Sequence, residues 1–110
     1  MRRPHTYTPQ TSDAAKVIGL EIARVRRKRR WTTAELASRA GISTTTLFRV
    51  ERGDPTTAIG IVFEVATLLG IQLFGADRNE LAALVGRGQE RLALLPARVR
   101  EPEGPVDDDF

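Results

Sequence analysis

The stretch from Thr32 to Gly53 reads TTAELASRAGISTTTLFRVERG, and it decides the fold of the chain. It predicts two short helices joined at Gly41, because glycine readily takes the left-handed backbone at a helix end. Thr32 and Ser43 stand where each helix begins, and such a hydroxyl accepts a backbone N–H of the first turn. Glu35 follows Thr32 by three residues and completes the pattern of a capping box.

The second predicted helix has two different sides. Leu47 and Val50 form its apolar side, at the three-residue spacing of a helix that packs on a core. The other side carries polar and basic side chains and one aromatic ring: Thr44, Thr45, Phe48, Arg49 and Arg52. By themselves these features fit either an ordinary antiparallel pair of core helices or a helix-turn-helix, whose second helix enters the major groove of DNA.

The run T-x-x-E-L-A-x-x-A-G-I-S-x-x-T-L-x-R-x-E-R-G over Thr32–Gly53 resembles the helix-turn-helix of the XRE (lambda-repressor-like) family. The resemblance covers about Ile18 to Phe74. It implies an all-α fold, a five-helix lambda-repressor-like helix-turn-helix domain that binds double-stranded DNA. Such domains read a near-palindromic operator as two-fold dimers, so a homodimer is expected.

The resemblance also implies roles for particular residues. Its base-contacting positions fall on Thr44, Thr45 and Arg49, and arginine can donate two hydrogen bonds to guanine O6 and N7. Phe48 either touches a thymine methyl or packs inward. Arg26 matches a family arginine that forms a structural ion pair with the residue at Glu51. Expected contacts to DNA phosphates fall on Arg27, Lys28, Arg29, Arg30, Thr33, Ser43 and Thr56.

Charge is unevenly distributed, although the net charge is only +3. Residues 1–30 hold nine basic and two acidic side chains, and residues 101–110 hold five acidic and no basic ones. A basic front indicates a polyanionic partner. We expect four parts, namely a flexible N-terminal arm (1–11), a DNA-binding domain (12–76), a C-terminal helix at a dimer or partner surface (77–96) and a disordered acidic tail (97–110).

Three further helices are predicted from apolar spacing. The first begins at Ser12 or Asp13 and runs to about Arg29, and its apolar residues are Val17, Ile18, Leu20, Ile22 and Val25. The next is capped by Thr57 and stopped by Gly70, and its apolar residues are Ile59, Val62, Phe63, Ala66 and Leu69. The last is capped by Asp77 or Asn79 and runs from Glu80 to about Leu95.

The segments after the helix-turn-helix resemble HipB-type antitoxins, which pair with a HipA-type kinase toxin and repress their own operon. The similar segments are 51–60, 68–74, 90–100 and 107–110. This resemblance implies that a short strand over residues 71–74 pairs across the dimer axis through Ile71, Leu73 and Phe74. The pattern itself allows either strand or buried coil there. A free-standing XRE-family regulator without a toxin partner is the alternative.

Composition argues against several other classes of protein. The chain has no cysteine and one histidine, His5, so it lacks the parts for thiolate metal sites and for histidine-based catalysis. It has no phosphate-binding glycine motif. We therefore expect no enzyme activity, no cofactor and no metal. No apolar run is long enough to span a membrane, and we expect a cytoplasmic, nucleoid-associated protein.

Overall fold

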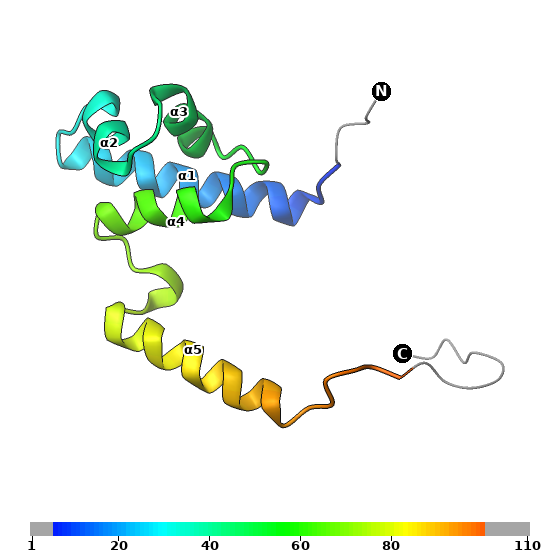
Figure 1. The fold of residues 1–110 in the computed structure, drawn as a ribbon. Coiled ribbons are helices and arrows are strands. Elements are labelled where there is room, and N and C mark those ends of the chain that lie inside the picture. Colours follow the sequence, from blue (N-terminus) through cyan, green and yellow to red (C-terminus); the bar gives the residue numbers. More distant parts are fainter. Residues whose placement is uncertain (1–5, 101–110) are drawn as a thin grey trace. The chain divides into compact units, whose positions relative to one another are not determined.

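The computed structural model describes residues 6–100, which fall into two compact units that divide after Gly75. The N-terminal unit holds four α-helices and one 3-10 turn, and the C-terminal unit holds one α-helix (Figure 1). No strand occurs within residues 6–100, so the predicted all-α class is confirmed. Predictions that concern residues 1–5 and 101–110 lie outside the described residues.

The first helix, α1 (Pro9–Lys28), begins three residues before the predicted start at Ser12. The side chain of Thr8 accepts the N–H of Thr11 at 3.3 Å, which caps the helix. Pro9 takes the first helical position, where its missing N–H costs nothing. Residues 9–11 are therefore helical and not part of a flexible arm.

The helix-turn-helix forms as predicted, from α2 (Thr33–Ala40) and α3 (Thr44–Arg52). The Thr32 side chain accepts the N–H of Glu35 at 3.0 Å, and the Ser43 side chain accepts the N–H of Thr46 at 3.1 Å. Gly41 ends α2 in the left-handed conformation, with φ 69°. Glu35 does not return a hydrogen bond to the Thr32 N–H, so only half of the predicted capping box is present.

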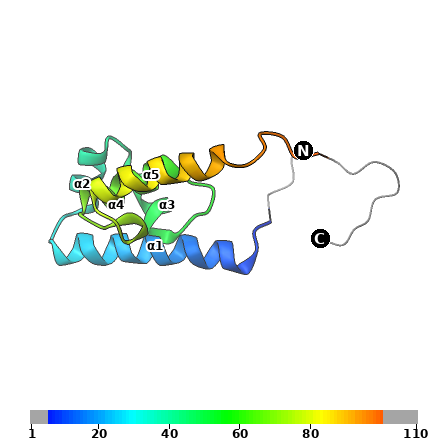
Figure 2. The same cartoon turned by 90° about the horizontal axis from the view of Figure 1, so that it is seen from below.

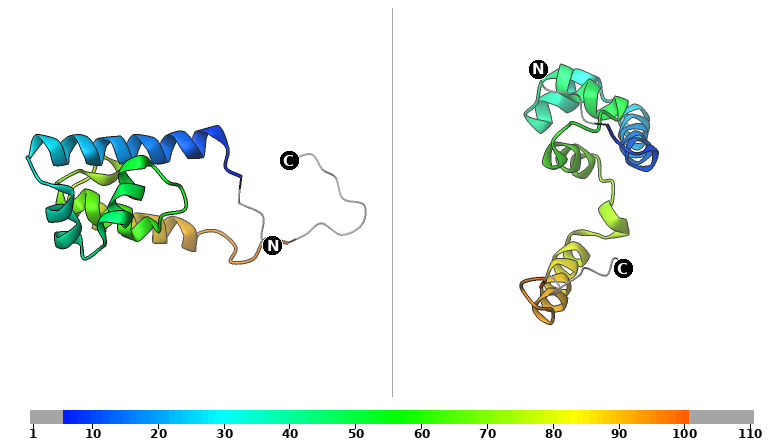
Figure 3. Two further views of the ribbon diagram at one scale, coloured as in Figure 1. Left: turned by 90° about the horizontal axis from the view of Figure 1, so that it is seen from above. Right: turned by 90° about the vertical axis from the view of Figure 1, so that its right-hand side faces the viewer.

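A small apolar core joins the helices of the N-terminal unit. The longest helix, α1, lies along one side of the unit, with the shorter helices beside it (Figures 2 and 3). The core residues are Ile22, Leu36, Ala37, Leu47, Val50, Val65, Ala66 and Leu69. Val17 and Leu20 were predicted in this core, but each is 66 % exposed. Ile22 defines the buried side of α1, and residues two and five positions away fall on other sides of the helix.

The helix after the connection, α4 (Ile59–Leu68), has no side-chain cap, so the prediction that Thr57 caps it is wrong. The N–H of Thr57 donates to the carbonyl of Asp54 at 3.2 Å and closes a turn. Beyond that turn, Ala58 takes the N-cap position and the helix begins at Ile59. The hydroxyl of Thr57 is buried and has no hydrogen-bond partner.

The predicted strand at residues 71–74 is absent. Residues Leu73–Gly75 instead form a single 3-10 turn, η1, in which Phe74 has φ 57°. A left-handed residue interrupts an extended segment, so this segment cannot continue as a strand in the described conformation. Ile71 and Leu73 pack against the core. Phe74 is 77 % exposed, and its ring forms a T-shaped pair with that of Phe63, at 6.1 Å between ring centroids.

The C-terminal unit contains α5 (Arg78–Ala93). Asp77 caps it, as one of the two predicted caps, and Glu80 returns the hydrogen bond, so that a complete capping box is present. Within the described residues, no helix combines the length and the apolar character needed to cross a membrane.

Candidate nucleic-acid interface

The exposed side of α3 presents the three residues expected to read bases. Thr44 and Thr45 lie in the first turn of the helix, and Arg49 lies one turn further on. All three side chains are exposed. No side-chain hydrogen bond or ion pair of Arg49 occurs within residues 6–100, and its charge acts only at long range on Asp54, so the guanidinium is accessible to a ligand. A recognition helix contacts base edges in the major groove with exposed residues near its N-terminal end, and α3 presents these groups in that way.

Phe48 lies on the same side of α3 and is 54 % exposed, so it does not pack inward. It borders a groove of about 900 Å³ between α1 and α3. The groove is lined by Leu20, Ala23, Arg24, Arg27, Thr45, Phe48, Arg49, Glu51 and Arg52. Four arginines with an exposed aromatic ring make a cationic surface that also offers apolar contact.

The end of α1 supplies the basic run. Arg27, Lys28, Arg29 and Arg30 are all exposed. Positive side chains at a helix C-terminus are favoured by the helix dipole, but four consecutive exposed cations exceed that need. Arg30 takes a left-handed backbone conformation with φ 59°, which ends the helix. The four side chains are therefore accessible to phosphates from solvent.

Two arginines flank Trp31 beside this run. The guanidinium carbon of Arg39 lies 4.3 Å from the centre of the Trp31 ring, and that of Arg29 lies 5.9 Å from it. Both distances permit cation–π attraction. Arg29 is thus partly held by Trp31, and the exposed Arg39 of α2 packs more closely on the same ring.

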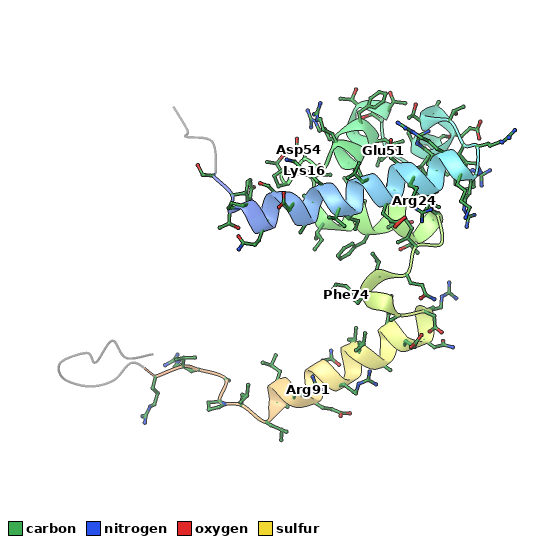
Figure 4. All side chains as sticks on the ribbon, turned by 180° about the vertical axis from the view of Figure 1, so that it is seen from behind. Lys16, Arg24, Glu51, Asp54, Phe74 and Arg91 are labelled. Carbon is green, nitrogen blue, oxygen red and sulfur yellow. The ribbon has the colours of Figure 1, made fainter. Side chains whose placement is uncertain are left out.

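An ion pair fixes α3 to α1. Arg26 donates from Nε to Glu51 Oε2 at 2.6 Å and from Nη2 to Glu51 Oε1 at 3.0 Å (Figure 4 labels Glu51). A third bond runs from Arg26 Nη1 to the carbonyl of Trp31 at 3.0 Å. The hydrogen bonds with Glu51 raise the pKa of Arg26 above its ordinary value. The two side chains are only 10 % and 11 % exposed, so this pair is structural and not available to DNA.

Two glycines let α1 and α3 approach closely. A Cβ atom on Gly19 would lie 2.5 Å from the carbonyl oxygen of Val50 and 2.7 Å from that of Glu51. A Cβ on Gly53 would lie 2.6 Å from the Cα of Lys16 (Figure 4 labels Lys16). Any other residue would push the helices apart. Sequence reasoning missed Gly19, although an isolated glycine inside a helical pattern is itself a signal of close packing.

The other expected phosphate contacts differ in their availability. Thr33 begins α2 and is partly exposed. The hydroxyl of Ser43 donates to Thr46 Oγ1 at 3.0 Å besides capping α3, so it is occupied within the chain. Thr56 donates its N–H and its hydroxyl to Asp54 Oδ1, at 2.9 and 2.7 Å. These hydrogen bonds lower the pKa of Asp54 below its ordinary value.

The uncapped start of α4 is a feature that sequence reasoning missed. The prediction assigned a cap to Thr57, whereas the first backbone N–H groups of α4 have no side-chain acceptor. A Cβ atom on Gly60 would meet nothing within 4 Å, so the surface there is open. Unpaired N–H groups at a helix start favour an anion. This end of α4 therefore suits a phosphate better than the occupied hydroxyl of Thr56 does.

Comparison with known proteins agrees with this geometry. Residues 22–75 match the model of the helix-turn-helix family. The match takes in the C-terminal third of α1, all of α2, α3 and α4, and the η1 turn. These residues form a helix-turn-helix domain of the XRE type, and the protein is a DNA-binding transcriptional regulator. No curated protein and no solved structure matches the chain.

Proposed function

We propose that this protein is a repressor that binds a near-palindromic operator as a homodimer on chromosomal DNA in the cytoplasm. The observation that carries the proposal is the exposed side of α3, where Thr44, Thr45 and Arg49 stand together beside the basic end of α1. Phosphate contacts supply salt-sensitive affinity, and base contacts supply sequence preference. The open N-terminus of α4 adds a further phosphate contact.

We further propose that the repressor is the antitoxin of a HipA-type kinase toxin and autoregulates the operon that encodes both proteins. The support is the similarity of residues 51–60, 68–74, 90–100 and 107–110 to HipB-type antitoxins. In addition, α5 buries none of its side chains, and a minimal repressor does not require such a surface. A free-standing regulator is the second candidate, and it is favoured by the family match being confined to residues 22–75.

The DNA-binding part is tested by selecting binding sites from a pool of random duplexes with the full-length protein. We expect enrichment of a sequence with two-fold symmetry, since homodimers read paired half-sites. The same selection is then repeated with Arg49→Ala. If the wild-type protein enriched no sequence, the proposed base-reading role of α3 would be wrong.

The antitoxin part is tested by co-expressing the tagged chain with the reading frame beside its gene. Co-purification of a kinase-like protein, together with relief of that protein's toxicity, is the expected result. A harmless neighbour that does not co-purify would exclude this antitoxin role and leave the free-standing regulator. Neither result depends on the operator selection, so the two parts of the proposal fail separately.

A further inference from the structure

The helix α5 exposes an apolar stripe and buries none of its side chains. Val85 is 59 % exposed, Leu92 is 70 % exposed, and Leu95, just after the helix end, is 63 % exposed. Helices of about this length are marginal in water without a packed apolar side. The capping box at Asp77 helps the helix to start, but it does not cover the stripe. The stripe therefore calls for a partner.

The spacing of the stripe indicates which kind of partner fits. Leu81, Val85, Gly88, Leu92 and Leu95 follow one another at alternating steps of four and three residues. This is the heptad pattern by which one helix packs along a second helix. Leu84 borders the stripe, and the opposite side of α5 is polar apart from Ala83, Gly86, Ala93 and Leu94. One narrow seam of this kind fits a single partner helix.

We propose that the partner is α5 of a second copy of this chain, running antiparallel. In the register we propose, Leu81 packs against Leu92 of the second copy, and Val85 packs into the space above Gly88 of the second copy. The two-fold axis repeats both contacts, so four apolar layers form. This inference rests on the proposed homodimer and specifies the contact that holds it together.

Packing at Gly88 favours the antiparallel direction. In a parallel pair with matching register, the two Gly88 residues would face each other in the middle of the seam. They would leave a void between Val85 and Leu92, and voids in an apolar contact cost stability. In the antiparallel pair, the side chain of Val85 from one helix fills the space at Gly88 of the other. The two-fold axis repeats this contact, so neither Gly88 leaves a void.

Charge beside the seam favours the same direction. Glu80 and Arg91 flank the stripe on the same side of α5, near its opposite ends (Figure 4 labels Arg91). They are eleven residues apart, about 16 Å along a helix axis, so within one copy they are too distant to pair. Antiparallel pairing brings each Glu80 to Arg91 of the other copy, twice by symmetry. Parallel pairing with matching register keeps Glu80 of one copy eleven residues from Arg91 of the other.

The oligomeric state of the full-length chain tests the contact. We expect a mass of about twice the 12.2 kDa of one chain in analytical ultracentrifugation. Leu92→Asp places a charge in the seam and should raise the dimer dissociation constant at least a hundredfold. Leu94→Asp is the matched control, because Leu94 is 85 % exposed on the other side of the helix. A wild-type monomer, or a Leu92→Asp dimer of unchanged affinity, would overturn the inference.

The same measurement separates this contact from the one expected at residues 71–74. Phe74→Asp changes the exposed ring of η1 and leaves α5 intact. We expect that variant to remain dimeric. If Phe74→Asp dissociates the dimer and Leu92→Asp does not, the dimer exists but α5 does not hold it. That result overturns this inference and leaves the proposed DNA-binding homodimer standing.

Disulfide cross-linking tests whether the two α5 helices run antiparallel. The chain has no cysteine of its own, so only the introduced cysteines can form disulfides. Two single variants, Leu81→Cys and Leu92→Cys, carry tags of different size and are oxidised alone and mixed. We expect a disulfide between the two variants in the mixture and little dimer from either alone. Efficient homodisulfides of each single variant would indicate parallel helices and overturn the inference. Circular dichroism of each variant checks that the helices are retained.

Discussion

Replacing Gly19 by alanine adds a single methyl group and should still lower the stability of the protein strongly. The methyl group of Gly19→Ala would meet two backbone carbonyls of α3 within 2.7 Å, and backbone atoms cannot move aside singly. We expect a loss of about 1–3 kcal/mol in the free energy of unfolding, the usual cost of overpacking. Urea denaturation measures it.

Gly86→Ala is the control for that change, because a Cβ there would meet nothing within 4 Å. Glycine inside a helix costs about 1 kcal/mol relative to alanine. The control should therefore keep or slightly raise stability. If Gly19→Ala behaved in the same way as Gly86→Ala, α1 and α3 would not pack as closely as described.

The Arg26–Glu51 ion pair should contribute strongly to the stability of the folded protein. Both side chains are nearly buried, and Arg26 also holds the carbonyl of Trp31. Removing one member of a buried pair leaves an uncompensated charge, which costs about 3–5 kcal/mol. We expect Glu51→Ala and Arg26→Ala to destabilise strongly, and the double variant to lose much less than the sum of both. Additive losses in a double-mutant cycle would show that the pair is not coupled.

Single residues were more predictable where local chemistry determines them. The hydroxyl caps at Thr32 and Ser43 are found where the sequence predicts them, because a cap depends on neighbours three residues away. Gly19 and the exposure of Val17 depend on which helix lies opposite, and no short pattern contains that information. The contacts of Thr44, Thr45 and Arg49 with DNA stay predictions.

At the scale of elements, the turn before α4 has a defined pH dependence. Hydrogen bonds from Thr56 lower the pKa of Asp54 below its ordinary value of 3.8. A group whose pKa is lower in the folded state adds stability above its unfolded pKa and loses it as pH falls through the folded value. Asp54→Asn should therefore be less stable than wild type at pH 7, and the difference should vanish in strong acid. A difference that was unchanged between pH 7 and pH 2 would contradict this role.

Helices α3 and α1 should contribute to DNA binding in different ways. Arg49→Ala should lower the preference for the selected operator over random DNA by about 1–3 kcal/mol, because it removes a base-reading side chain. Lys28→Ala should weaken binding to both DNAs equally. It should also reduce the slope of log affinity against log salt concentration by about one. Fluorescence anisotropy on both duplexes at several salt concentrations measures these effects. Unchanged selectivity in Arg49→Ala would mean that α3 does not read the bases.

Elements with strong local signals were predicted well, and those shaped by their surroundings were not. Asp77 starts α5 as its capping box indicates, because that signal is contained within four residues. Residues 71–74 have an apolar composition that suits a strand, yet Phe74 turns into the left-handed region beside Phe63. The predicted cap at Thr57 is wrong because Asp54 organises the preceding turn. Neither the turn at Phe74 nor the turn at Asp54 can be predicted from local composition alone.

For the whole molecule, charge predicts the kind of partner but not the assembly. The nine basic residues within 1–30 indicate a polyanion, and the end of that run is exposed at the end of α1. In the proposed dimer, the contact that covers α5 sets the number of DNA-binding units that act together. The apolar residues of α5 are visible in the sequence, and the structure adds that they form one stripe and that the helix itself buries none of its side chains.

The salt dependence of operator binding connects the assembly with its function. Each DNA-binding unit displaces counterions from the phosphates it touches, and the slope of log affinity against log salt is proportional to their number. A dimer on two half-sites should therefore show about twice the slope of a monomer. Full-length Leu92→Asp should bind a duplex with two half-sites with about half the wild-type slope, and Leu94→Asp should keep the wild-type slope.

The exposed residues of α3 are the same in both variants, so the preferred base at each position of a half-site should not change. A reduced slope with unchanged base preference would mean that α5 sets the number of units on the DNA and α3 sets the sequence. A monomeric Leu92→Asp protein that kept the full slope would show that one unit makes all the phosphate contacts. The proposal that a dimer binds two half-sites of a two-fold operator would then be wrong.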